Sequence, residues 1–98
     1  MKIEIEKIQE LLKDDSHNIW EKYNKKRLYL DFAKIIRLEV DRYNTGNISC
    51  AHLDGEKISN SKAYKYLQGK AYIDLNTNVL ECQYMNSEMI NKLENALS

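Results

Sequence analysis

The spacing of apolar residues predicts a helix at each end of the chain. Over about residues 2–14, apolar side chains recur every three or four residues with charged ones between them, as in a helix with one buried face. These apolar residues are Ile5, Ile8, Leu11 and Leu12. A second stripe predicts a closing helix from about Ser87, capped by Asn86. Its inner positions are Met89, Ile90, Leu93 and Leu97.

Two β-hairpins are predicted in the second half of the chain. Residues 48–53 and 56–58 flank Asp54-Gly55, a pair typical of a two-residue hairpin turn because that turn needs positive φ angles. Residues 71–84 form a second strand-like pair around the polar turn at 76–78. Since both connections are short, the paired strands are expected to be antiparallel.

A short helix is predicted between these two hairpins. Ser59 or Ser61 is placed to cap its start, and Gly69 is placed to end it. Its apolar positions are Ala63, Tyr66 and Leu67. The segment therefore separates the hairpins by one helical element.

The segment from residue 18 to residue 32 contains at least one strand. Alternation of apolar and polar residues over 27–32 predicts a strand whose core-facing side chains are Leu28, Leu30 and Phe32. Residues 18–23 fit a strand joined to it through residues 24–26, or else residues 16–23 form a short second helix. The pattern leaves both assignments open.

Residues 33–43 also fit two patterns. Helical spacing is shown by Phe32, Ile35, Ile36, Val40 and Tyr43. A competing strand alternation runs through Ile36, Leu38 and Val40. The charged residues between the apolar ones favour the helix, and a turn at 44–47 with Gly46 is expected to end it.

Together these elements predict an α+β fold in the order α-β-α-β-β-α-β-β-α. A small antiparallel sheet built from hairpins would carry about four helices on one face. The chain has 98 residues, without a linker, a repeat or a low-complexity tract, so a single compact domain over residues 1–98 is expected.

Charge and hydropathy argue against two classes of protein, those that bind nucleic acid through an overall positive charge and those that span a membrane. Fifteen basic residues balance fifteen acidic ones, so the chain lacks the overall positive field of many nucleic-acid-binding proteins. No apolar run is long enough for a membrane span, and no signal-peptide pattern is present, which predicts a cytoplasmic protein with no membrane partner. The short, proline-free, lysine- and asparagine-rich composition has the general look of small accessory proteins encoded by phages and other mobile elements.

No catalytic, metal-binding or cofactor-binding motif is found. Cys50 and His52 would share one strand face, but a structural zinc site needs four ligands and no second pair follows. Cys82 with His17 or His52 would form a nucleophile and base only if the fold brought them together. We therefore expect a protein that is not an enzyme and needs no cofactor.

The segment 22–29 combines cations with aromatic rings. Such a mixture is typical of single-strand nucleic-acid binding, in which cations contact phosphates and rings stack on bases. The ordinary alternative is a solvated loop whose lysines discourage strand pairing. The candidate nucleic-acid-binding residues are Lys22, Tyr23, Lys25, Lys26, Arg27 and Tyr29.

Seven tyrosines against one phenylalanine indicate a binding surface, because tyrosine gives rigid contact area with a polar tip. The candidate partner-binding residues are Tyr64, Tyr72 and Asp74, of which the last two would share the outer face of a strand. The leading hypothesis is a binding protein that occupies a surface of a larger protein or complex, as an inhibitor does. Nucleic-acid binding is the alternative, and a homodimer is compatible with so small a core.

Overall fold

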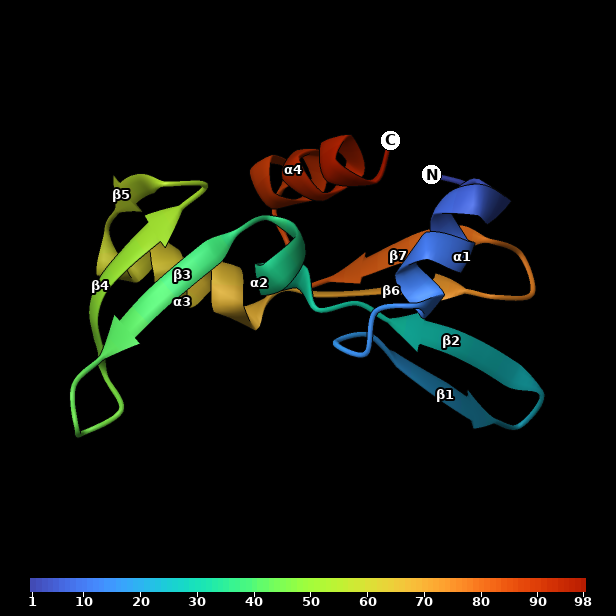
Figure 1. Cartoon of the computed structure of the whole chain (residues 1–98), viewed down its shortest axis with the longest axis horizontal. Coiled ribbons are helices and arrows are strands. Elements are labelled where there is room, and N and C mark those ends of the chain that lie inside the picture. Colours follow the sequence, from blue (N-terminus) through green and yellow to red (C-terminus); the bar gives the residue numbers. More distant parts are fainter.

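The computed structural model describes residues 1–98 and contains four helices and two antiparallel sheets (Figure 1). The elements are α1 (Ile5–Leu12), β1 (Asn18–Lys22), β2 (Lys25–Tyr29), α2 (Phe32–Ile35), β3 (Leu38–Arg42), β4 (Ile48–Leu53), β5 (Glu56–Ile58), α3 (Asn60–Gln68), β6 (Lys70–Asp74), β7 (Val79–Gln83) and α4 (Ser87–Leu97). The α+β class and the predicted succession of hairpins and helices are confirmed. The strands divide into two sheets, ordered β1-β2-β6-β7 and β3-β4-β5, where one sheet was expected.

One main hydrophobic core joins the two sheets. Its 15 buried residues include Leu28, Ile73 and Leu80 from the four-stranded sheet and Leu53 from the three-stranded sheet. Helix α4 covers them with Met89, Leu93 and Leu97, and α1 adds Ile8 and Leu11. The molecule measures 41 × 25 × 23 Å, and the two sheets lie at opposite ends of its long axis (Figure 1). No helix is both long and apolar enough to cross a membrane.

The segment left open at residues 18–23 is a strand. β1 pairs with β2 in an antiparallel hairpin, with Lys22 opposite Lys25. The turn consists of Tyr23 and Asn24, whose φ angles are 52° and 63°. This two-residue turn with positive φ at both positions matches the twist of the strands. The turn predicted at residues 24–26 was therefore placed too late, since Lys25 and Lys26 belong to β2.

The helix predicted over residues 33–43 is wrong beyond its first turn. α2 has four residues, capped by the Asp31 side chain, which accepts a hydrogen bond from the Lys34 N–H at 3.2 Å. Arg37 then adopts a φ of 58°, which interrupts a right-handed helix. Residues 38–42 form β3 and pair with β4. These residues follow the competing strand alternation through Ile36, Leu38 and Val40, because they pair with the β4–β5 hairpin, which lies further along the chain.

The predicted helix ends are largely confirmed. Ser59 Oγ accepts from the Lys62 N–H at 3.1 Å, and Asn86 Oδ1 accepts from the Met89 N–H at 2.9 Å. Gly69 ends α3 with a φ of −65°, so it is not needed for a left-handed conformation. Instead, a Cβ there would lie 2.7 Å from the Met89 Cε, so Gly69 leaves room for the end of the Met89 side chain.

Helix α1 is shorter and less buried than its pattern predicts. Ile8 and Leu11 are buried, but Ile5 and Leu12 remain 57% and 42% exposed. Ile3 is buried ahead of the helix, and its N–H donates to the Asn78 carbonyl oxygen at 2.7 Å. The N-terminal residues therefore lie along β7 rather than extending α1.

An ion pair links the end of α1 to α2. The Lys34 Nζ lies 2.9 and 2.8 Å from the two Asp14 carboxylate oxygens, and Ser16 donates to Asp14 from both its N–H and its hydroxyl. The hydrogen bond from Lys34, and to a smaller extent those from Ser16, hold the pKa of Asp14 well below its usual range. The carboxylate thus fixes the connection that leads into β1.

We expect Arg37→Gly to be more stable than Arg37→Ala by about 1 kcal/mol, because only glycine adopts a positive φ without steric cost. Both variants lose the exposed ion pair of Arg37 with Asp54, so the difference between them isolates the backbone effect. Urea unfolding of the two variants measures it. Equal stability would contradict a left-handed Arg37.

We expect Asp14→Asn to lower stability at neutral pH and to weaken the loss of stability in acid. Because the folded state lowers the pKa of Asp14, this carboxylate stabilises the protein above its unfolded pKa of about 4, and the stabilisation is lost as the pH falls below that value. Urea midpoints between neutral and acidic pH measure the effect. Asp15→Asn, at an exposed neighbour without an ion pair, is the control; an equal effect there would contradict the assignment.

Candidate functional site

The four-stranded sheet buries one face and leaves the other without a covering helix. Residues directly opposite each other in antiparallel strands point to the same face. Leu28, Ile73 and Leu80 form one such row and lie in the main core. The rows on either side point outward. They are Trp20, Arg27, Asp74 and Val79, and Asn18, Tyr29, Tyr72 and Glu81.

Three aromatic rings and one guanidinium form a continuous layer on this outer face. The rings of Trp20 and Tyr29 meet edge to face with centroids 6.5 Å apart, and those of Tyr29 and Tyr72 lie 5.3 Å apart. Arg27 covers Tyr72, with its Cζ 4.5 Å from the ring centroid. We call Trp20, Arg27, Tyr29 and Tyr72 the aromatic platform. Trp20 is 43% exposed, whereas Tyr72 is 6% exposed beneath its neighbours.

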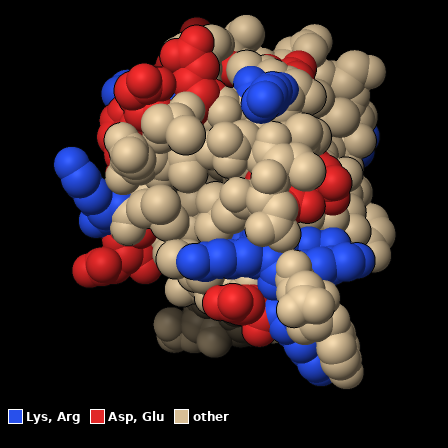
Figure 2. Space-filling view, turned by 90° about the vertical axis from the view of Figure 1, so that its right-hand side faces the viewer, with Lys and Arg blue, Asp and Glu red and all other residues tan.

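Unpaired cations continue the platform toward the hairpin tip. Lys22 and Lys25 lie opposite each other on β1 and β2, so two like charges face the same side. The Lys22 Nζ lies 4.9 Å from the ring centroid of Tyr23, which is 82% exposed in the turn. Figure 2 shows basic side chains gathered in the lower part of this end of the molecule, where Figure 1 places the hairpin. Lys22, Lys25 and Arg27 have no ion-pair partner within 4.0 Å, unlike Lys7, Lys34, Arg37 and Lys62.

Acidic side chains occupy the other half of the outer face. Asp74 Oδ1 accepts from the Asn76 N–H at 2.8 Å and so holds the turn between β6 and β7. Glu81, opposite Tyr72 on β7, raises the pKa of the Tyr72 hydroxyl, which keeps it neutral. The outer face thus carries the aromatic rings with the unpaired cations on β1–β2, whereas β6–β7 carries Asp74 and Glu81 together with one cation, Lys70, at the start of β6.

The structure brings most of the segment 22–29 together on this surface. Lys22, Lys25, Arg27 and Tyr29 lie on the outer face, with Tyr23 at the tip. Lys26 points to the opposite face, where it lies across from Glu21. Trp20 was not among the residues predicted from the sequence. The alternation of side chains through residues 18–22 would place Trp20 on the same face as Lys22. This pattern applies only if the segment is a strand, and the sequence left that open.

The three residues predicted to bind a protein partner do not form one surface. Tyr64 lies on α3, and its hydroxyl accepts from the Ile48 N–H of β4 at 2.9 Å. Tyr72 and Asp74 lie on β6 in the other sheet. The expected outer face for Tyr72 is confirmed, but its expected availability is wrong, because Arg27 and Tyr29 pack over it.

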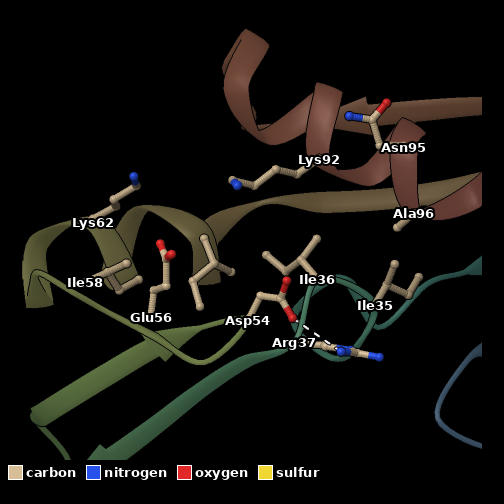
Figure 3. A pocket seen from close by; sticks show the side chains of 11 residues that line it. Ile35, Ile36, Arg37, Asp54, Glu56, Ile58, Lys62, Lys92, Asn95 and Ala96 are labelled. Atoms are coloured by element: carbon tan, nitrogen blue, oxygen red, sulfur yellow. Dashed lines mark hydrogen bonds and ion pairs between the residues drawn. The ribbon is translucent and has the colours of Figure 1, made fainter.

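A second feature is a cleft of about 500 Å³ between α4 and the β4–β5 hairpin (Figure 3). Ile35, Ile36 and Ile58 contribute apolar lining, and Lys92 reaches across from α4. The Arg37–Asp54 pair closes one side at 3.3 Å, and Lys62 pairs with Glu88 at 3.1 Å. Its lining contains no Ser, Thr, Tyr, Cys or His side chain. It therefore lacks a hydroxyl or thiol nucleophile and a histidine base.

The cysteines and histidines do not assemble into a site. Cys50 donates to Asp41 Oδ2 at 3.2 Å, and this carboxylate raises the pKa of the Cys50 thiol. Burial raises the pKa of Cys82 in the other sheet. His17 is buried, and its Nδ1 accepts from the Asp31 N–H at 2.9 Å. No three His, Cys, Asp or Glu side chains lie close enough together to hold a metal ion.

Comparison with models of known families, with curated proteins and with solved structures found no match. The outer sheet face is therefore the feature of the molecule from which a function is inferred.

We expect Tyr64→Phe to destabilise the protein by about 1 kcal/mol, because the buried Ile48 N–H would lose its acceptor. Thermal unfolding measures the change. Tyr84→Phe is the control, since Tyr84 is 73% exposed. A Tyr64→Phe variant as stable as the control would contradict a structural role for the hydroxyl.

Proposed function

We propose that the chain binds single-stranded nucleic acid along the β1–β2 half of the outer sheet face. The observation that supports this most is the aromatic platform, which continues into two unpaired lysines on an uncovered antiparallel sheet. Sheet faces with exposed aromatic side chains are a common surface for stacking unpaired bases. A double helix keeps its base faces covered, so single strands fit this surface better.

The residues take distinct roles in this proposal. Trp20 and Tyr29 offer aromatic rings on which bases stack, and Tyr23 extends the surface at the hairpin tip. Lys22 and Lys25 contact phosphates beside these rings. Arg27, held over Tyr72, adds a third positive charge in the middle of the surface. Tyr72 acts from below by supporting Arg27 and Tyr29.

Local charge explains how a chain of zero net charge could bind a polyanion. The like charges of Lys22 and Lys25 repel each other across the hairpin, and a phosphate between them would relieve that repulsion. The carboxylates of Asp74 and Glu81, beside the platform on β6 and β7, would keep the nucleic-acid strand on β1 and β2. Affinity is expected to be modest, because only three cations contribute.

The protein-inhibitor hypothesis has less support from the geometry. Of its three residues, Tyr64 accepts a hydrogen bond from the backbone, Tyr72 is covered and Asp74 holds a turn. It stays a hypothesis, and the outer sheet face is the surface to which a protein partner would also bind.

Trp20, the single tryptophan, reports directly on binding. We expect single-stranded oligonucleotides of about 12 nucleotides to quench its fluorescence. A log–log plot of affinity against salt should have a slope of about −2, for three phosphate contacts at about 0.7 each. Trp20→Ala should weaken binding by about 1–3 kcal/mol, followed by the anisotropy of a labelled oligonucleotide.

A matched pair of charge reversals tests the location. Lys22→Glu with Lys25→Glu should abolish most of the binding, whereas Lys57→Glu with Lys65→Glu makes the same change in net charge on exposed positions of β5 and α3. Equal losses in the two double variants would contradict a local site. If no oligonucleotide binds, the nucleic-acid proposal is wrong and the protein-partner hypothesis replaces it.

A further inference from the structure

The outer edge of β1 carries backbone groups with no partner. Along β2, the Lys26 carbonyl oxygen accepts from the Leu75 N–H and the Leu30 N–H donates to the Ala71 carbonyl oxygen, so even-numbered residues of β2 face β6. The odd-numbered residues of β2 therefore face β1, where they pair with residues 18, 20 and 22. The N–H and C=O groups of Ile19 and Glu21 are left pointing away from the sheet.

β1 differs from the other sheet edges in being regular and uncovered. The edge of β7 is partly occupied by residues 1–3, with the Leu80 N–H donating to the Met1 carbonyl oxygen at 2.9 Å. The pairing of β3 with β4 shifts register between Asp41 and Arg42, where Ser49 of β4 has no partner, so this edge is irregular. β5 has three residues. All five residues of β1 are exposed, including Ile19 on the core-facing side at 53%.

We propose that β1 pairs antiparallel with β1 of a second copy of this chain about a twofold axis at Trp20. In this register Ile19 lies opposite Glu21 of the partner subunit, and both residues have outward-facing backbone groups. Four backbone hydrogen bonds form across the axis, two in each of the symmetric pairs. Asn18 lies opposite Lys22 of the partner subunit, so no like charges are opposed.

Neighbouring registers fit less well. An axis at Glu21 would place this carboxylate opposite the same residue of the partner, which is repulsive. An axis at Ile19 would need the N–H of His17, which already donates to the Asp14 carbonyl oxygen at 3.2 Å. The hydrogen-bond direction and the charges of β1 thus select the axis at Trp20.

The pairing would join the two four-stranded sheets into one and place the two aromatic platforms side by side. Trp20 would face Trp20 of the partner subunit as a pair without mutual hydrogen bonds, in which side chains approach most closely. The aromatic platforms would then be continuous across the axis. This proposal stands apart from nucleic-acid binding, because the pairing needs only the protein.

Two substitutions at one exposed position test the dimer by sedimentation at increasing protein concentration. Ile19→Glu places a carboxylate opposite Glu21 of the partner subunit, and Ile19→Lys places a cation there, while both remove the same apolar side chain. We expect Ile19→Glu to raise the dimer dissociation constant about tenfold and Ile19→Lys to leave it unchanged or lower it. A protein that stays monomeric up to about 1 mM, or equal effects of the two variants, would overturn the proposal.

Disulfide trapping tests the register. In a background with Cys50→Ser and Cys82→Ala, Trp20→Cys would bring two Cα atoms to about 4.5 Å across the axis, within disulfide range. Lys22→Cys would leave its two copies about 13 Å apart along the strands. We expect a covalent dimer from Trp20→Cys and none from Lys22→Cys under mild oxidation. Trapping by Lys22→Cys alone would overturn the register.

Discussion

Burial of one face of the four-stranded sheet is the constraint on which the rest of the structure depends. Leu28, Ile73 and Leu80 form a row that α1 and α4 cover, and this fixes which face every other residue of those strands presents. Because side chains alternate along a strand, burial of this row turns Trp20, Arg27, Tyr29 and Tyr72 outward together. The candidate site is therefore a consequence of the core.

The covering helices do not extend over the whole sheet. β1 lies beyond them, so Ile19 remains exposed although it points to the core side. β1 consequently depends on its turn and on pairing with β2, which the core holds through Leu28. One hairpin thereby holds the unpaired cations, the exposed tryptophan and the free sheet edge, which explains why the two proposals concern the same part of the molecule while resting on different groups.

Local signals predicted most elements of the fold. The Asp54-Gly55 turn, the Ser59 and Asn86 caps and the stripe of α4 depend on residues close in sequence, and the structure has them as predicted. The error at residues 33–43 arose where two periodicities competed. There the pairing of β3 with β4 decides between them, and β4 lies outside residues 33–43. Likewise, no local pattern indicates that Tyr64 binds the Ile48 backbone.

By itself, the sequence determined the α+β class, the hairpin turns in the second half of the chain and a segment at 22–29 that combines four cations with two tyrosines. These follow from φ preferences, capping and side-chain alternation, all of which act over a few residues. Only the tertiary structure decided that Trp20 and Tyr72 join that segment, that Tyr72 is covered, and that the strands form two sheets. Strand pairing across long separations sets these features, because it places side chains from β1, β2 and β6 on one face.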